Sequence, residues 1–248
     1  MKRRHLFYAI LALLAAWQLL SMLLSQPILP SPIAVAVSFA RELVNGELFG
    51  HLLASLWRVI ASTLMAIALA SPAGLVLGQS SRLNSIFSPV IYLLYPIPKV
   101  VLVPIVLLFF GIGDLPKIII IFLILFFQIL VLVRDQAAAI RPELIQSVRS
   151  LGAGRRALFR FVYLPASLPA ILTALRQSVG TAVAVLYVAE LFATRRGLGY
   201  YIYLSGSTLY NYPAMYAGIV AMSLLGALLY FTTDRVEKYL CPWKGNGS

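Results

Sequence analysis

"PKIIIIFLILFFQILVLVR", residues 116–134, decides the fold of this chain. No charged residue lies between Lys117 and Arg134, and a helix of this length spans the roughly 30 Å hydrocarbon core of a bilayer. The rest of the chain has the same character: 61% of its 248 residues are hydrophobic, 11% are charged, and the mean hydropathy is +0.91. The sequence therefore predicts an all-α integral membrane protein.

Six apolar runs predict six transmembrane helices, since each crossing needs about 20 predominantly apolar residues. The predicted spans are residues 6–24, 55–78, 86–110, 116–134, 166–190 and 213–233. The basic start of the chain resembles a signal peptide. A signal peptide has an apolar run of roughly 7–15 residues, followed by an A-x-A cleavage site. The run here is longer and no such site follows it, so we expect that the first helix is not cleaved off.

The distribution of positive charge predicts the orientation, because Lys and Arg collect in cytoplasmic loops. With the amino terminus inside, 13 of the 20 basic residues lie on the cytoplasmic side or at its boundary. They are Lys2, Arg3, Arg4, Arg82, Arg134, Arg141, Arg149, Arg155, Arg156, Arg160, Arg235, Lys238 and Lys244. We therefore expect both termini in the cytoplasm, and the net charge of +12 needs no nucleic-acid partner.

The segment between the first two spans is too polar to cross a membrane. Pro27, Pro30 and Pro32 interrupt it, and residues 33–44 then place apolar side chains at helical spacing. This pattern predicts an interfacial helix that lies along the bilayer surface.

The densest charge lies in "RSLGAGRRALFRFVYLPASLP", Arg149–Pro169. Residues 143–151 and 154–164 are each amphipathic as a helix, and Gly152 and Gly154 allow a sharp corner between them. Two interpretations remain open from composition alone. The loop is an ordinary positive-inside loop with short helices on the membrane, or it is a docking element for a cytoplasmic protein.

The spacing in this loop resembles a known family. Gly152 is followed by nine residues and then by "VYLP", Val162–Pro165. ABC importer permeases have the cytoplasmic consensus E-A-A, three residues, G, nine residues, I-x-L-P. Gln146, Ser147 and Val148 occupy the E-A-A positions, so the opening of that signature is absent.

Further blocks are similar to one branch of this family, whose members take up nitrate, taurine, alkanesulfonates or vitamin precursors. They are "LPSP" at 29–32, "HLLASLWRV" at 51–59, "YPIPKVVLVPIVLLFFGIGDLPK" at 95–117, "LGAGRRALFRFVYLPASLPAILTALR" at 151–176 and "AELFATRRGLGYYI" at 189–202. The resemblance implies a type I importer permease fold. Residues 1–50 would hold the first span and the outer interfacial segment, and residues 51–248 the permease core with a coupling loop at 135–165.

The resemblance also implies partners and coupling residues. The coupling loop would sit in a groove of a separate ATPase dimer through Gln146, Ser147, Val148, Gly152, Ala153, Arg155, Arg156, Leu164 and Pro165. The chain has no GxxxxGK[ST] phosphate loop, so ATP and Mg²⁺ are expected on that partner. A solute-binding protein on the outer side and a second permease copy complete the expected complex in a bacterial-type inner membrane. A homodimer with 86–134 and 166–190 at its centre is expected, and a heterodimer stays open.

Basic side chains inside the spans need an explanation, because a charge at mid-bilayer costs at least about 2.5–3.5 kcal/mol. Lys99 and Arg176 are the two cases. Each either lines a translocation path that favours anions or fulfils a structural role by binding a helix-end carbonyl or an ion-pair partner. Tyr92 and Tyr95 are further candidates for the path, beside three prolines that interrupt the same span.

The sequence contains no pattern for intrinsic catalysis. It has a single cysteine and two histidines, and it lacks GxSxG and HExxH, so we expect neither an enzyme nor a metal site. The expected function is solute permeation in an ATP-driven importer. A nitrate-, sulfonate- or taurine-type anion is the first expectation and a neutral aromatic vitamin precursor the second. An ATP-independent secondary transporter and a membrane scaffold are the rivals from other classes.

Overall fold

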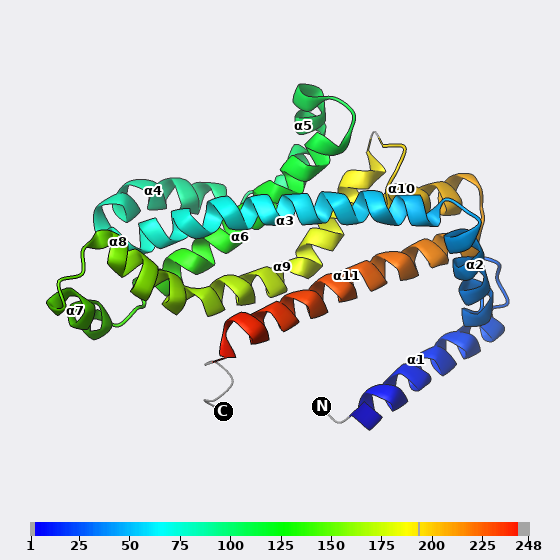
Figure 1. Ribbon diagram of the computed structural model, residues 1–248. Helices are drawn as coiled ribbons and strands as arrows, with labels where there is room; N and C mark the ends of the chain where they lie inside the picture. The colour runs from blue at the N-terminus through cyan, green and yellow to red at the C-terminus, as the bar shows by residue number, and fades with distance from the viewer. Residues whose placement is uncertain (1–2, 193, 243–248) are drawn as a thin grey trace. The chain divides into compact units, whose positions relative to one another are not determined.

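The computed structural model describes residues 3–192 and 194–242, and every regular element in this part is helical (Figure 1). The elements are α1 (Arg3–Leu24), α2 (Pro32–Val44), α3 (Leu48–Gln79), α4 (Ser81–Leu94), η1 (Lys99–Leu102), α5 (Val103–Phe110), α6 (Asp114–Ala138), α7 (Pro142–Ser150), α8 (Arg155–Leu158), η2 (Phe159–Tyr163), α9 (Leu164–Leu191), α10 (Leu198–Tyr203), η3 (Leu204–Thr208) and α11 (Tyr212–Leu240). Lys2 and Lys244, two of the predicted cytoplasmic charges, lie outside the described residues.

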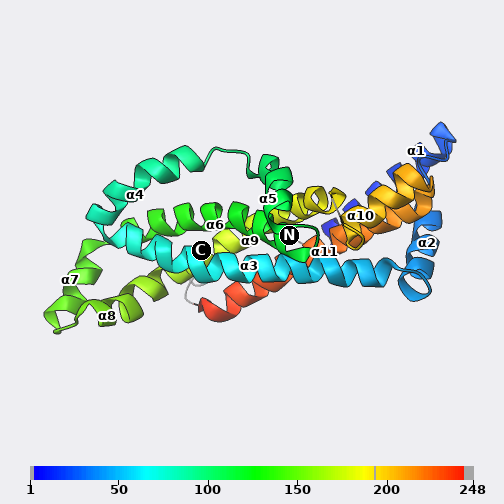
Figure 2. The same ribbon diagram turned by 90° about the horizontal axis from the view of Figure 1, so that it is seen from above.

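Five of the six predicted spans are confirmed as helices long and apolar enough to cross a membrane. The third, predicted as one run over 86–110, consists of α4 followed by η1 and α5, and the two halves are bent by 77° (Figure 2). Pro96 and Pro98 lie in the bend, where a proline supplies no backbone N–H and disfavours a helical residue before it. The predicted interruption of this span is therefore confirmed.

The described residues form two compact units. Unit 1 contains those of 1–55 and 194–225, and unit 2 contains those of 56–193 and 226–248, so α3 and α11 contribute to both. The sequence analysis divided the chain into a first segment, residues 1–50, and a permease core, residues 51–248. The two compact units do not test that division, which stays a prediction.

Unit 1 is fixed around the start of α2. The Ser31 hydroxyl caps this helix by accepting a hydrogen bond from the Ala34 N–H, and Pro32 occupies the first turn, where no N–H is needed. The Trp17 indole N–H donates to the Pro30 carbonyl at 3.1 Å, and the Trp17 ring lies 5.9 Å from that of Tyr216. The predicted helix over 33–44 is thereby confirmed as α2 and connected to α1.

Unit 2 has its core between α3, α6 and α9. The fully buried side chains include Ile121, Ile129 and Leu186, and α6 packs along much of α9. Lipid tails are as apolar as these side chains, so close packing rather than the hydrophobic effect must hold such helices together in a bilayer.

A close contact between α3 and α6 in unit 2 depends on two glycines one turn apart in α3. A Cβ on Gly74 would lie 2.9 Å from the Leu130 carbonyl oxygen, and a Cβ on Gly78 would collide with the Arg134 carbonyl oxygen. These obstacles are backbone atoms of α6, which cannot rotate away. Small residues at this spacing let two helix backbones approach each other, as in the GxxxG motif of membrane helices.

Gly78→Ala is therefore expected to destabilise unit 2 by about 1–3 kcal/mol, the usual range for overpacking. Gly50→Ala is the matched control in the same helix, because a Cβ there meets nothing within 4 Å. Thermal unfolding of the purified protein in detergent measures the difference. Equal melting temperatures for the two variants would contradict the close α3–α6 contact.

Candidate functional site

The corner of the coupling loop, residues 135–165, is built from hydrogen bonds that end α7. The Gly152 N–H donates to the Arg149 carbonyl at 2.9 Å, and the Ala153 N–H donates to the Val148 carbonyl at 3.4 Å. This is the Schellman arrangement, and it requires a left-handed residue at the position of Gly152. Gly152 has φ +82°, as that geometry demands. The predicted corner between two helical pieces is confirmed.

The second amphipathic piece, predicted over residues 154–164, is not a separate helix, because it continues into the next span. α8, η2 and α9 form one continuous helix from Arg155 to Leu191 (Figure 1). The π-turn η2 ends at Tyr163, two residues before Pro165, and the Leu164 N–H donates to the Phe159 carbonyl. A wider turn accommodates a proline that supplies no N–H and would crowd the preceding turn. α8 and α9 are thus parts of one helix, with no break between the loop and the span.

The coupling loop has a small apolar core of its own. Leu158, Val162 and Tyr163 are buried there, and Ile145 and Val148 of α7 pack against them. These two apolar side chains of α7 therefore fix α7 against α8 and η2. This internal core makes the loop a compact body rather than two helices lying independently on a membrane.

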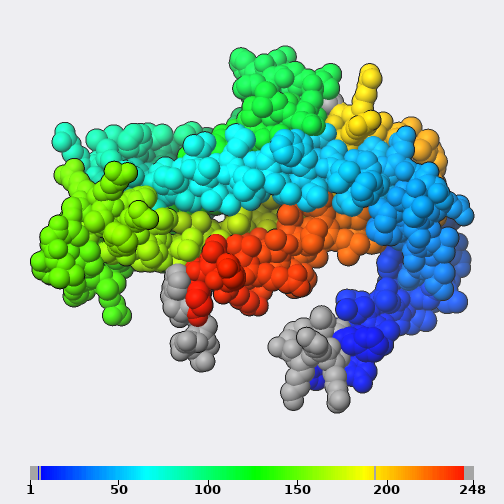
Figure 3. Space-filling model, viewed as in Figure 1, coloured from blue at the N-terminus to red at the C-terminus, as the bar shows by residue number. Residues whose placement is uncertain are grey.

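The remaining coupling residues predicted from the sequence lie at the surface of this body. Gln146, Ser147, Gly152, Arg155, Arg156 and Leu164 are exposed, and Val148, Ala153 and Pro165 are partly buried. Leu144, Leu151 and Phe161 are also exposed although they are apolar. Figure 3 shows the loop projecting at one end of unit 2. A surface of exposed apolar groups with nearby arginines is suited to a protein partner.

A hollow of about 330 Å³ opens in unit 2 where the third span is broken. Its lining includes Tyr95, Lys99, Phe127, Gln128, Thr181 and Val185. The Lys99 ammonium donates to the carbonyls of Leu94 and Tyr95 at 2.7 and 2.6 Å. Pro98 has no N–H to offer the Leu94 carbonyl, so Lys99 stabilises the helix end that the proline created.

Tyr92 and Tyr95 have different surroundings. The Tyr95 ring lies 5.6 Å from the Lys99 ammonium, at the hollow. The Tyr92 ring lies 5.4 Å from the Arg134 guanidinium and is not part of the lining. The role of Tyr92 in a path stays a prediction.

Arg176, near the middle of α9, lies in an ion-pair cluster with two carboxylates near the end of α11. Its Nη1 lies 3.0 Å from Asp234 Oδ1 and 3.2 Å from Glu237 Oε2, and Thr173 donates to the same Glu237 at 3.1 Å. Both carboxylates follow the predicted end of the last span at 233, because α11 continues to Leu240. These contacts support the structural alternative for Arg176.

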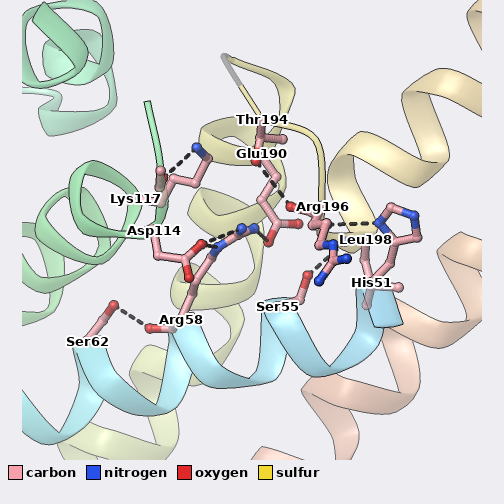
Figure 4. Close-up of polar contacts among 12 residues, drawn as sticks. His51, Ser55, Arg58, Ser62, Asp114, Lys117, Glu190, Thr194, Arg196 and Leu198 are labelled. Atoms are coloured by element: carbon pink, nitrogen blue, oxygen red, sulfur yellow. Dashed lines mark hydrogen bonds and ion pairs between the residues drawn. The ribbon is translucent and has the colours of Figure 1, made fainter. Parts of the chain in front are cut away.

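A second ion cluster, which the sequence analysis missed, joins α3, α6 and α9 (Figure 4). The Arg58 guanidinium lies 2.6 Å from Asp114 Oδ1 and 2.6 Å from Glu190 Oε1. Arg58 and Glu190 are buried, at 3% and 0% exposure. Lys117 lies beside them and donates to the Gly113 carbonyl at 2.8 Å. Separations of 56 and 132 residues leave no local signal for such pairs.

Lys99 differs from three arginines of unit 2 in its partners. Arg58, Arg134 and Arg176 each have a carboxylate partner. Within residues 3–192 and 194–242, Lys99 contacts carbonyls and rings only, and no carboxylate pairs with it. Carbonyls orient an ammonium group without neutralising its charge. The hollow therefore contains an uncompensated positive charge, which attracts anions.

Comparison with known proteins gives the family of this chain. Residues 66–244 match the model of the "Binding-protein-dependent transport system inner membrane component" family. The chain belongs to this family. It is a multi-pass inner-membrane permease of an ABC importer, as the resemblance predicted, and the rival interpretations as an ATP-independent transporter or a scaffold find no support.

Two curated relatives and one solved structure illustrate the match. The permease is 31% identical to the taurine transport system permease protein TauC of Escherichia coli, covering 92% of this chain and 85% of the relative. It is 30% identical to the formylaminopyrimidine transport permease protein ThiX of Halalkalibacterium halodurans, covering 94% and 93%. A chain of the inward-facing MetNI methionine ABC transporter is 21% identical and superposes with a TM-score of 0.67 over 80% of the permease and 98% of that chain. The helical permease fold is therefore confirmed.

Breaking the buried Arg58 cluster is expected to destabilise the permease strongly. Glu190→Gln removes one carboxylate from a buried guanidinium, which costs on the order of 3 kcal/mol. Glu143→Gln, at an exposed position of α7, is the matched control and is expected to leave stability unchanged. Thermal unfolding in detergent compares the two, and a Glu190→Gln variant as stable as the control would contradict the inferred weight of this cluster.

Proposed function

We propose that this permease forms a homodimeric translocation path for a small organic anion, such as a sulfonate, in an ATP-driven importer. Its partners are an ATPase dimer at the coupling loop and a solute-binding protein on the outer side. Both chain termini lie in the cytoplasm in this arrangement. ATP and Mg²⁺ belong to the ATPase, since the permease sequence has no phosphate loop.

The compact coupling loop supports the proposed link to an ATPase. When the ATPase pair closes, α7 and α8 move together because Ile145 and Val148 pack on the side chains of α8 and η2. The movement reaches α9 without a hinge, since the helix is continuous from Arg155 to Leu191. The spans then change from inward- to outward-open, the binding protein delivers its solute, and hydrolysis by the partner restores the first state.

The exposed face of α5 supports the proposed second copy. Leu108 and Phe109 are 85% and 81% exposed in a helix that is apolar throughout. In Figure 3, α5 stands out from the rest of unit 2. In the proposed complex the path lies between two copies, and a two-fold pair would bring two such helices and their broken spans to a common centre.

The proposal of an anionic solute rests on the uncompensated charge of Lys99. An anion that enters the hollow gains the charge-assisted contact that no carboxylate of the described chain provides. The relationship to TauC is consistent with a sulfonate. The relationship to ThiX and the rings of Tyr95 and Phe127 in the hollow favour the alternative, a neutral aromatic solute that stacks on them.

Gly152→Val is expected to uncouple uptake from ATP hydrolysis or to release the ATPase. At φ +82° a β-branched side chain is strained by its own backbone, although a Cβ meets no neighbour within 4 Å. Gly154→Val is the matched control, because Gly154 has φ −76° and equally open surroundings. Co-purification of the ATPase and uptake by the assembled importer distinguish them. If Gly152→Val couples as well as Gly154→Val, the coupling loop does not act as a lever.

Lys99→Gln is expected to reduce sulfonate uptake by about tenfold or more, the effect of losing a hydrogen bond to a charged group. Lys99→Arg keeps the charge and should retain most of the uptake. Arg176→Gln should instead lower thermal stability, since Asp234 and Glu237 lose their shared cation. Uptake is normalised to the amount of assembled complex. Unchanged sulfonate uptake in Lys99→Gln would favour the neutral aromatic solute.

A further inference from the structure

The beginning of α10 is held by two side chains of α3, and all of these residues belong to unit 1 (Figure 4). The Gly197 N–H donates to His51 Nδ1 at 3.0 Å, and the Leu198 N–H donates to the Ser55 hydroxyl at 2.8 Å. A helix leaves such N–H groups without internal partners at its first turn. His51 is 4% exposed and Ser55 0%, so water does not readily replace either side chain.

Only the His51 contact depends on protonation. An imidazole nitrogen accepts a hydrogen bond when it carries no proton, so Nδ1 is bare here and Nε2 carries the single proton of the neutral ring. A second proton on Nδ1 would set two N–H groups against each other, and the contact with Gly197 would be lost. Histidine changes charge near neutral pH, since its ordinary pKa is about 6.5.

The surroundings of His51 contain groups that act on both of its protonation states. They are Glu47, Arg195 and Arg196, which line the same polar hollow of about 340 Å³, and Tyr200 and Tyr201, whose rings lie 5.9 and 5.3 Å from the imidazole. Glu47 Oε2 lies 3.6 Å from His51 Nε2 and favours the imidazolium ion, whereas the two arginines disfavour it. The tyrosines are uncharged near neutral pH. Each form of His51 thus has its own partner: Gly197 for the neutral ring and Glu47 for the imidazolium ion.

We propose that neutral His51 is a positioning residue that holds the arginine segment, residues 194–197, and that its protonation releases this segment. Arg195 and Arg196 are exposed, so the segment presents two cations at the surface of unit 1. The inference rests on the proposed function, in which this end of the permease faces the solute-binding protein. The permease would then present one fixed surface to that protein at neutral or basic pH and lose it in an acidic medium.

The first test measures amide hydrogen exchange in peptides that cover residues 194–203 of the assembled importer, at roughly pH 8 and roughly pH 5. His51→Asn places a carbonyl oxygen close to the position of Nδ1, and this acceptor does not titrate. The exchange rate of the unmodified protein is divided by that of the variant at each pH, so the intrinsic pH dependence of exchange cancels. We expect equal rates at the basic pH and about tenfold faster exchange in the unmodified protein at the acidic pH, because a buried N–H then has no acceptor.

Two further variants define the origin of this effect. His5→Asn replaces the other histidine, which is exposed in α1, and should leave the acid release unchanged. Glu47→Gln removes the carboxylate that favours the imidazolium ion, so the midpoint of release should move to lower pH. Glu47 is exposed, and this variant therefore keeps the test valid if His51→Asn does not assemble. A midpoint that stays or moves to higher pH in Glu47→Gln overturns the exchange of partners.

The second test measures how strongly the binding protein stimulates ATP hydrolysis by the importer in lipid vesicles. Each importer is normalised to its own stimulation at the basic pH, which cancels differences in assembly. We expect the unmodified importer to lose about tenfold more stimulation than His51→Asn at the acidic pH.

The outcomes separate this inference from the function on which it rests. The same pH dependence of exchange in the unmodified protein and in His51→Asn overturns the role of His51 and leaves the importer function intact. Acid-dependent exchange with equal stimulation in the two proteins overturns the role of the arginine segment in docking. If the binding protein does not stimulate the unmodified importer at the basic pH, the proposed function is wrong, and the docking role of the arginine segment is withdrawn with it.

Discussion

The constraint on which this structure depends is that a charge in a low-dielectric interior needs a partner inside the protein. Arg58 meets it with Asp114 and Glu190, and these contacts join three helices that are distant in the sequence. Arg176 meets it with carboxylates of α11. These ion pairs connect α3, α6 and α9 in one cluster and α9 and α11 in the other. Replacing either set with apolar residues would remove these directed contacts along with the desolvation cost.

Lys99 is informative because it departs from this rule. Its ammonium group binds carbonyls that a proline break leaves without helical partners, so its position is structural. Its charge nevertheless remains uncompensated at an open hollow. The two interpretations that the sequence left open, a structural role and a role in the path, are therefore compatible in one residue. A group that is held in place by two hydrogen bonds and still has bonding capacity left has the properties of a pre-organised binding site.

The sequence predicted the spans and the coupling corner because both depend on local signals. Apolar length marks a span, and a glycine between two amphipathic pieces marks a helix end. Hydropathy does not mark where a helix stops, so α11 was expected to end at 233 and extends to Leu240. The same limit concealed Asp234 and Glu237 as partners of Arg176. Contacts between Gly78 and α6, or between Arg58 and Glu190, depend on tertiary packing and leave no periodic trace in a single sequence.

The π-turn η2 keeps the helix continuous where a proline would be expected to end it. The sequence predicted a new span that begins at residue 166, directly after Pro165, and proline usually ends the helix before it. Here one wider turn absorbs the missing N–H, and the helix continues. A break at this position would have placed a flexible joint between the loop and α9. The continuous helix and the apolar core of the loop instead form one body, so a force applied at α7 is exerted on the span whose Thr181 and Val185 line the hollow.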